Sequence, residues 1–109
     1  MYVQIVRFKT SMTEQELLKK AKARSDRCRA TDGLLQKYYL SYPDTDEFGA
    51  VYIWESEEAM KNFRRTGLAG SLPEAYQMKA APNIAQAEVK MTLYPEVSAT
   101  RKALTIGRR

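Results

Sequence analysis

The first nine residues, MYVQIVRFK, are rich in β-branched and aromatic side chains and are apolar on both alternating faces. Because successive side chains of a strand point to opposite sides, this segment predicts a β-strand that is covered on both faces. A single domain of 109 residues has to build both covers from one modest core or obtain one of them from another molecule. This requirement constrains the fold more than any other feature of the chain.

A helix is predicted after this strand. Thr13 and Glu16 have the spacing of a capping box, in which hydroxyl and carboxylate each satisfy a free amide. An apolar stripe at helical spacing follows and consists of Leu17, Leu18, Ala21, Ser25 and Cys28. Asp32-Gly33 predicts the end of the helix, since glycine can adopt the left-handed conformation.

A hairpin comes next, with strands over residues 34–42 and 49–55 and turn residues at 43–47. Ser56 is a good N-cap for a second helix, whose packing face is Ala59, Met60 and Phe63. Two glycines, Gly67 and Gly70, are predicted to interrupt it, before a short helical turn at 72–76. The alternation of Ala85, Ala87, Val89 and Met91 with polar residues predicts a fourth strand.

The resulting order is β-α-β-β-α-β, which predicts an α+β, ferredoxin-like domain with an antiparallel sheet and both helices on one face. Nothing remains in residues 1–94 to cover the other face of the first strand. A second copy of the chain can cover it, so we expect a homodimer in which two sheets form a dimeric α+β barrel. Residues 95–109 are expected to form a basic C-terminal arm or tail, which holds four of the 18 basic residues.

Composition excludes several classes of function. The chain has no histidine, which removes serine–histidine catalysis and nearly all zinc sites, and we expect no metal. The single cysteine, Cys28, cannot form an internal disulfide, which fits a cytoplasmic protein. No apolar stretch is long enough for a membrane helix. Much of the net charge of +5 lies in the tail, and we expect no nucleic-acid partner.

Aromatic residues mark the candidate site. Alternation places Tyr52 and Trp54 on one face of the third strand, and Phe63 and Tyr76 meet them there if that face is covered by the helices. Such a group is typical of the wall of a small-molecule pocket, but it is equally typical of a plain hydrophobic core. Both readings of Trp54 stay open, although its indole N–H requires a partner if it is buried.

The segment Gly49–Phe63, GAVYIWESEEAMKNF, together with the order of elements, resembles the dimeric α+β-barrel mono-oxygenases and, among them, the YdhR-like branch. This resemblance implies a pocket between helices and sheet that takes a flat aromatic substrate. Some members oxidise phenols or anthrones to quinones with molecular oxygen and without metal, flavin or heme. The fold also hosts isomerases, decarboxylases and proteins without a known reaction.

Other members of this family bind and degrade heme through an asparagine on the first strand, a tryptophan at the end of the third and a histidine. Trp54 matches that tryptophan. The histidine is missing, and the first strand offers only Gln4 as an amide. Heme degradation by that mechanism is therefore not expected.

The function predicted is a cofactor-independent mono-oxygenase for a small aromatic, phenolic or quinone-type compound. The polar groups expected to act in catalysis are Gln4, Tyr38 and Tyr76, and the substrate-binding walls are Tyr52, Trp54 and Phe63. The alternative is a non-catalytic dimeric barrel that binds a small hydrophobic ligand or a partner protein. Six bases on the first helix are interpreted as its solvated face, with an acidic partner as the alternative: Lys19, Lys20, Lys22, Arg24, Arg27 and Arg29.

Overall fold

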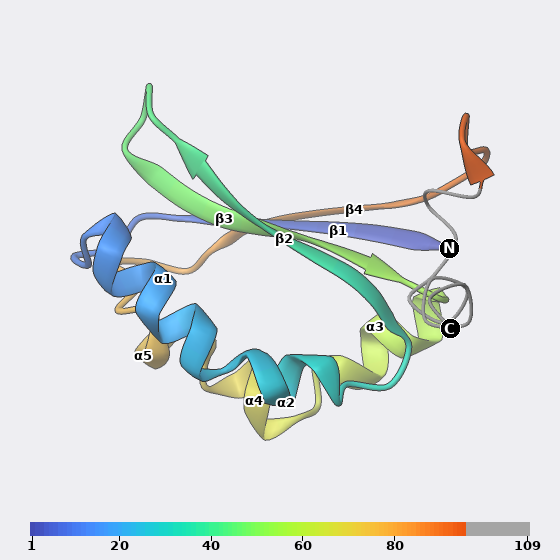
Figure 1. Ribbon diagram of the computed structural model, residues 1–109, viewed down its shortest axis with the longest axis horizontal. Coiled ribbons are helices and arrows are strands. Elements are labelled where there is room, and N and C mark those ends of the chain that lie inside the picture. Colours follow the sequence, from blue (N-terminus) through green and yellow to red (C-terminus); the bar gives the residue numbers. More distant parts are fainter. Residues whose placement is uncertain (96–109) are drawn as a thin grey trace, which may run out of the picture.

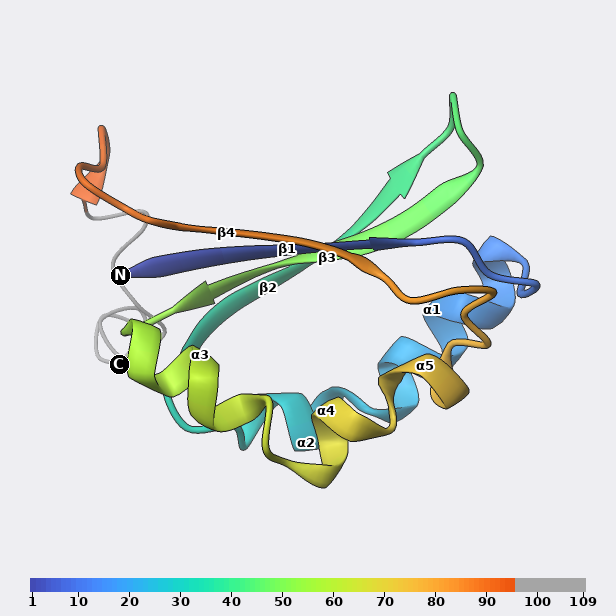
Figure 2. The same cartoon turned by 180° about the vertical axis from the view of Figure 1, so that it is seen from behind.

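A computed structural model describes residues 1–95, so the predicted C-terminal arm, apart from Pro95, lies outside the described residues. The element order is β1 (Tyr2–Phe8), α1 (Glu14–Ala23), α2 (Ser25–Arg29), β2 (Leu34–Tyr42), β3 (Glu47–Trp54), α3 (Glu57–Phe63), α4 (Gly67–Gly70), α5 (Leu72–Ala75) and β4 (Asn83–Glu88). The strands form one antiparallel sheet in the order β2-β3-β1-β4. All helices lie on one face of it (Figures 1 and 2). The predicted α+β, ferredoxin-like fold is confirmed.

The register of the strands assigns each side chain to one of the two faces of the sheet. In β1, Gln4 pairs with Tyr52, and these side chains are buried beneath the helices. The intervening Ile5 pairs with Val51, and both point away from the helices because side chains alternate along a strand. One face of the first strand is therefore buried by the helices of the domain, whereas the other belongs to the side of the sheet that faces away from them.

A bulge changes the faces of β2. Leu34 pairs with Trp54 and Gln36 with Ile53, so Leu35 is an extra residue without a partner position. Simple alternation from the buried Leu34 would place Tyr38 beneath the helices. The extra residue reverses the alternation, so that Lys37 pairs with Tyr52 and the next inward residue is Tyr39, opposite Ala50.

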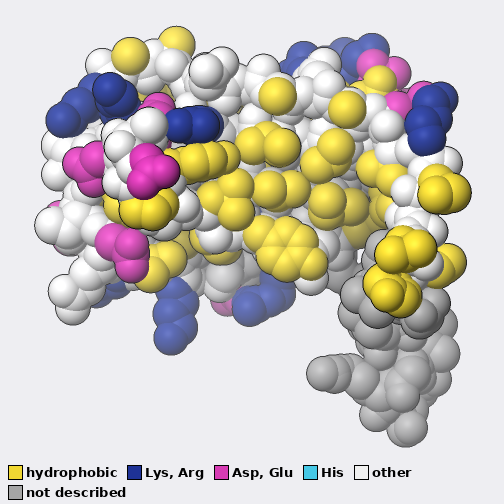
Figure 3. All heavy atoms as spheres, turned by 90° about the horizontal axis from the view of Figure 1, so that it is seen from above, with side chains coloured by type: hydrophobic (Ala, Val, Ile, Leu, Met, Phe, Trp, Pro, Cys, Tyr) yellow, Lys and Arg dark blue, Asp and Glu magenta, His cyan; other side chains and the backbone are white. Residues whose placement is uncertain are grey.

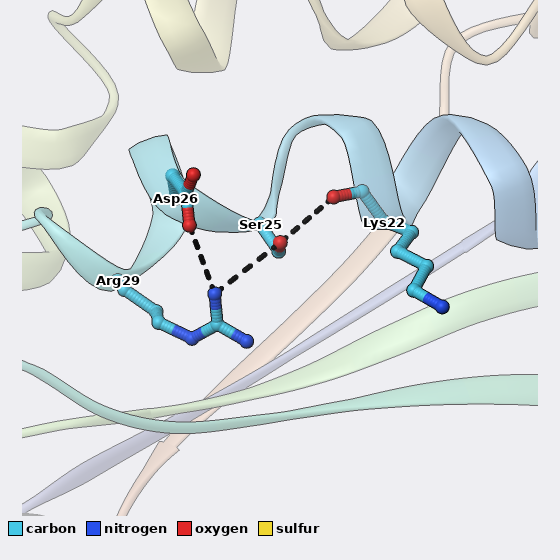
Figure 4. Close-up of polar contacts among 4 residues, drawn as sticks. All are labelled: Lys22, Ser25, Asp26 and Arg29. Atoms are coloured by element: carbon cyan, nitrogen blue, oxygen red, sulfur yellow. Dashed lines mark hydrogen bonds and ion pairs between the residues drawn. The ribbon is translucent and has the colours of Figure 1, made fainter.

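The first helix begins as predicted but is divided. Thr13 and Glu16 form the capping box, with bonds of 2.8 and 3.1 Å, and the amide of Thr13 holds the pKa of the Glu16 carboxyl below its usual range. The expected single helix is broken at Arg24, which separates α1 from α2. At the break the Ser25 hydroxyl donates to the Lys22 carbonyl over 2.7 Å (Figure 4). This local bond competes with regular helix hydrogen bonding.

The apolar stripe also differs from the prediction. Leu17 and Ala21 are buried, whereas Leu18 is exposed. The third inward position belongs to Arg24 rather than to Ser25, because Arg24 follows Ala21 by three residues and continues the same face. The interpretation of all six bases as a solvated face is therefore wrong for Arg24.

Ser56 caps α3 as predicted, accepting a hydrogen bond from the Ala59 amide, and Met60 and Phe63 are buried. Gly67 and Gly70 do not interrupt a helix, since they lie within α4, which Thr66 caps. The fourth strand begins two residues earlier than predicted and ends at Glu88, which leaves Met91 83% exposed.

Two glycines allow close approaches. Gly33 has φ +77°, and a Cβ there would lie 2.5 Å from the Cβ of Ala59, so it lets the α2–β2 turn pass against α3. Gly49 in β3 lies against β1, where a Cβ would meet the Val6 carbonyl oxygen at 2.1 Å. Any side chain at Gly49 would push apart the two central strands of the sheet.

The face of the sheet opposite the helices has no cover within residues 1–95. Figure 3 looks onto this face and shows a continuous hydrophobic patch with charged side chains at its edges. Its apolar members, assigned by strand register, are Val3, Ile5, Tyr38, Leu40, Val51, Ile53, Ala85 and Ala87. We call this set the open face. Among the described residues, no helix is both long and apolar enough to cross a membrane.

Candidate functional site

An aromatic cluster lies between the sheet and α3. The rings of Tyr52 and Trp54 are stacked, with centroids 5.9 Å apart and planes 3° apart. Phe63 from α3 packs against both, at 5.8 Å from Tyr52 and 5.2 Å from Trp54. These separations are those of favourable aromatic contacts. The predicted meeting of Tyr52, Trp54 and Phe63 is confirmed as a contact.

Trp54 has no exposed surface, and its indole N–H donates to the Gln4 side-chain oxygen over 3.1 Å. Gln4 is only 4% exposed, so this bond joins β1 and β3 in the interior. A buried indole N–H without a partner would be costly, which explains why an amide occurs at an otherwise apolar position of β1. Gln4 thus fixes the orientation of the Trp54 indole within the core.

Two cavities are lined by Tyr52 of the aromatic cluster. The larger is about 200 Å³, and the residues on its lining include Gln4, Tyr52, Phe63, Arg64 and Ile84. The smaller is about 20 Å³, and its lining includes Lys37, Tyr39, Tyr52 and Tyr76. Four residues line both, namely Val6, Tyr52, Leu72 and Met78, so the cavities are neighbours. Apolar walls with a few polar groups are the usual form of a small-molecule site.

A larger concavity lies elsewhere and has a different character. It is an open groove of about 610 Å³ between the α2–β2 turn and α3, and charged residues such as Arg27, Asp32 and Glu58 border it. Apart from Phe63, no member of the aromatic cluster lines this groove. Its size therefore does not make it the better candidate.

Tyr76 follows α5 and is held in place by its main chain. The Thr10 hydroxyl donates to the Tyr76 carbonyl over 2.6 Å, and the next residue, Gln77, has φ +46°, which turns the chain back toward β1. The ring packs 6.0 Å from that of Phe8. Tyr76 is 5% exposed, and its buried hydroxyl has no acceptor for its hydrogen among the described residues; the neighbouring Arg24 guanidinium can only donate to it. Such a group is rare in a folded protein and indicates a place for a ligand or a water molecule.

Two cations border the same region. The ammonium of Lys37 lies 4.6 Å from the centroid of the Tyr52 ring and 4.7 Å from that of Tyr39, as in cation–π contacts. The Arg24 guanidinium lies 5.7 Å from the centroid of the Tyr76 ring and donates to the Leu68 carbonyl and the Ser71 hydroxyl, both at 3.0 Å. Burial lowers the pKa of Lys37, and the nearby charge of Arg24 lowers it further.

The tyrosines of this layer stay protonated at neutral pH. Burial raises the pKa of Tyr39, Tyr52 and Tyr76 because it disfavours the phenolate. The charge of Arg24 acts against this shift at each of them. All three hydroxyls are therefore available as hydrogen-bond donors.

The structure brings together five of the six residues predicted for the site: Gln4, Tyr52, Trp54, Phe63 and Tyr76. Tyr38 does not join them, because the bulge at Leu35 places it on the open face, where it is 55% exposed. Its neighbour Tyr39 takes that position. Reasoning from sequence also missed Lys37 and Arg24. The pairing of Lys37 with Tyr52 would have revealed the first, and the heptad spacing of Leu17, Ala21 and Arg24 the second.

Within residues 1–95, no group of three or more histidine, cysteine, aspartate or glutamate side chains is placed to hold a metal ion. The aromatic layer itself contains no carboxylate on the lining of either cavity. What the arrangement offers is apolar surface, hydroxyl and amide hydrogen bonds, and positive charge. It can bind a flat organic molecule and stabilise negative charge that develops on its oxygen.

No family model matches the sequence, and no curated protein resembles it in sequence. Solved structures do resemble it. A protein of unknown function from Nitrosomonas europaea has 18% identity and a TM-score of 0.70 over 86% of this chain and 93% of its own. The mono-oxygenase ActVA-Orf6 of Streptomyces coelicolor, in complex with nanaomycin D, has 20% identity and a TM-score of 0.66 over 86% and 91%.

SnoaB, a cofactor-independent oxygenase from Streptomyces nogalater, has 17% identity and a TM-score of 0.64 over 84% of this chain and 95% of its own. At these identities the likeness is one of fold. It extends over most of the length of each chain rather than over one supersecondary motif. The chain therefore has the ferredoxin-like α+β fold found in the mono-oxygenases of antibiotic biosynthesis.

Proposed function

We propose that the protein is a cofactor-independent mono-oxygenase that acts on a small phenolic or quinol-type compound. The observation that carries the proposal is the cavity of about 200 Å³, whose lining combines the buried Gln4 with the rings of Tyr52 and Phe63. The fold shared with ActVA-Orf6 and SnoaB supports the same reading.

The reaction requires few functional groups from the protein. A phenol or anthrone that loses a proton becomes electron-rich enough to react with molecular oxygen. In an anthrone a CH2 group becomes a carbonyl, and in a phenol or quinol a ring C–H carbon gains the oxygen and the ring becomes a quinone. In both cases one oxygen atom enters the product and the other leaves as water, so the substrate supplies all four electrons. The protein binds the ring, excludes water and stabilises the deprotonated form. Gln4 and Tyr76 are the groups that can hydrogen-bond the substrate's oxygens, and Tyr52 and Phe63 hold its ring.

An oxygen electrode with a panel of hydroxyanthrones and naphthoquinols tests the proposal. We expect uptake of one oxygen molecule per substrate, with carbonyl product formed in the same amount. The uptake should persist in protein dialysed against a chelator and free of visible chromophores. Gln4→Leu should reduce turnover about tenfold or more, as expected when one hydrogen bond to a charged group is lost. Saturable binding without oxygen uptake would contradict the enzymatic reading.

That result would favour the second candidate, a non-catalytic barrel that binds a small hydrophobic molecule. The observation in its favour is that neither cavity of the aromatic layer is lined by a carboxylate or a histidine. Trp54 also has no exposed surface with which to touch a ligand. Binding alone needs only the apolar walls that are present.

We further propose that two chains associate through the open face to form a dimeric α+β barrel. The open face is a continuous apolar surface on the sheet, which an isolated soluble domain would leave in water (Figure 3). Light scattering should give twice the chain mass, and Val51→Glu at its centre should give a monomer. A monomeric wild-type protein at high concentration would contradict the proposal.

A further inference from the structure

The interior between sheet and helices carries positive charge that no carboxylate balances. Arg24 is 8% exposed and bonds only uncharged acceptors, the Leu68 carbonyl and the Ser71 hydroxyl. Lys37 is partly exposed, since it also lines an open groove of about 530 Å³ beside α2, and its ammonium donates a long hydrogen bond of 3.8 Å to the Cys28 sulfur. Over residues 1–95 neither cation forms an ion pair. Charges in such surroundings are costly unless an opposite charge accompanies them.

A hydrogen-bond donor without a partner lies beside these cations. Tyr76 is 95% buried, its hydroxyl has no acceptor among the described residues, and it lines the cavity of about 20 Å³ together with Lys37 and Tyr52. A cavity of this size holds about one water molecule or a single oxygen atom of a larger ligand. A water molecule would satisfy the hydroxyl of Tyr76 but leave both positive charges without a counter-ion.

We propose that Tyr76, Lys37 and Arg24 form a subsite for one anionic oxygen of the ligand, and that the ligand is a small planar molecule with an ionised hydroxyl or carboxylate. Its ring lies in the larger cavity and its anionic oxygen in the smaller one, which shares four lining residues with the larger. The proposal rests on the proposed function in taking this layer as the ligand site.

Each residue has a distinct part in this subsite. The Tyr76 hydroxyl donates a hydrogen bond to the oxygen, and Lys37 supplies the adjacent charge from its place between the rings of Tyr39 and Tyr52. Arg24, whose guanidinium lies over the ring of Tyr76, adds a second charge from outside the cavity and is fixed by its two bonds to the α4–α5 segment. The two lowering influences on the pKa of Lys37, burial and the charge of Arg24, are both opposed by a bound anion.

The subsite also supplies what the proposed oxidation lacks. No carboxylate or histidine lines the cavities, and Lys37 acts here as the charged ammonium, so the deprotonated substrate is favoured by stabilising its anion. A phenol bound there has a lowered pKa and ionises near neutral pH. Its proton then passes to solvent or to buffer, and no further reactant is required.

para-Nitrophenol is a suitable probe, because its anion is yellow and its neutral acid is not. Two relatives of the same shape provide the comparison: para-nitroanisole, which cannot ionise, and para-nitrobenzoate, which carries a carboxylate. Binding to the full chain is measured by calorimetry, and the visible spectrum reports the ionisation state of the bound probe. The variants are Tyr76→Phe and Lys37→Met, with Tyr42→Phe on the opposite face of the sheet as the matched control.

We expect para-nitrophenol to bind as the yellow anion at a pH at which the free compound is mostly neutral. Tyr76→Phe should weaken this binding about tenfold, and Lys37→Met should weaken it about ten- to a hundredfold and abolish the yellow shift. Tyr42→Phe should change neither. para-Nitroanisole should bind weakly and equally to all variants.

The remaining outcomes separate this inference from the proposed function. Equal binding of para-nitroanisole and para-nitrophenol, or no binding of any probe, overturns the subsite. Preference for para-nitrobenzoate alone supports the anion subsite but contradicts a phenolic substrate. Tight binding of the phenolate with no oxygen uptake from any hydroxyanthrone or naphthoquinol leaves the subsite intact and overturns only the mono-oxygenase.

Discussion

Both faces of the sheet carry apolar side chains, yet they differ in the polar groups that accompany them. The covered face mixes aromatic rings with the interior polar groups Gln4, Lys37 and Tyr76, and Arg24 joins them from the helix layer. On the open face, charge is placed at the edge, where Arg7 pairs with Glu47 at 2.9 Å and lies over the ring of Tyr42.

This difference separates two ways in which an apolar surface is used. A surface that serves association needs only shape and hydrophobicity, with charges at its rim. One that serves chemistry also holds polar groups in places where water is excluded, at a cost to stability. The hydroxyl of Tyr76 and the weakly bonded ammonium of Lys37 are such groups, and both lie on the side of the sheet that the helices cover.

The largest expected effect comes from substituting two adjacent residues of β3 that lie on opposite faces of the sheet. Trp54→Ala should lower the free energy of unfolding by about 3–5 kcal/mol, because it empties the fully buried centre of the core. Ile53→Ala, on the open face, should cost about 1 kcal/mol, because Ile53 is only partly buried. Urea unfolding measures both. If dimerisation covers the open face, the Ile53 value rises with protein concentration and the Trp54 value changes less.

Removing the interior amide should have the next largest effect. Gln4→Leu leaves the indole N–H of Trp54 buried without an acceptor, which should destabilise the protein by about 1–3 kcal/mol. The matched control is Gln36→Leu, which changes an exposed amide on β2 and should stay within about 0.5 kcal/mol. In a double-mutant cycle with Trp54→Phe, the loss at Gln4 should largely disappear. Additive losses would mean that the bond contributes nothing.

Two substitutions should raise stability while they weaken ligand binding. Tyr76→Phe removes a buried hydroxyl without a partner, and Lys37→Met removes a poorly paired ammonium, so each should gain about 1 kcal/mol in urea unfolding. Tyr42→Phe, on the other face, should be neutral. A loss of stability in Tyr76→Phe would show that the hydroxyl is satisfied in the free protein and would weaken the anion subsite.

Alkaline pH should produce the smallest effect. The pKa of the Tyr52 phenol is raised by burial, so the folded state keeps its proton when the unfolded state loses it. Stability from this group is therefore complete below the ordinary tyrosine pKa and falls as pH rises above it, by about half a kcal/mol at about pH 10. Tyr52→Phe should reduce the fall in unfolding free energy between neutral pH and this value. An unchanged pH profile would contradict burial as the cause.

Much of the fold followed from local signals in the sequence. The cap at Thr13, the cap at Ser56 and the alternation around Tyr52 each depend on a few neighbouring residues, and each occurs as predicted. The order of elements then leaves few arrangements for a sheet of four strands. The contact of Tyr52 and Trp54 with Phe63 was predictable for the same reason, since strand and helix adjoin in the chain.

The polar part of the site was not predictable in this way. The inward position of Lys37 depends on its pairing with β3 and on an extra residue in β2. Neither can be recognised in a single sequence. Arg24 was assigned to solvent because arginine is rarely buried. Its acceptors, the Leu68 carbonyl and the Ser71 hydroxyl, are more than 40 residues away in the chain.

Because of the bulge at Leu35, the number of residues in β2 decides which of its side chains face the site. If the hairpin between Tyr42 and Glu47 keeps its register, the residues of β2 from Gln36 onward keep their faces, and the extra residue is absorbed before them. A deletion of Leu35 that shifted these residues instead would put Tyr38 inside and Lys37 outside, although every side chain of the site would still be encoded. The loss of one codon would then remove the positive charge of Lys37 from the site without changing any of the site's residues.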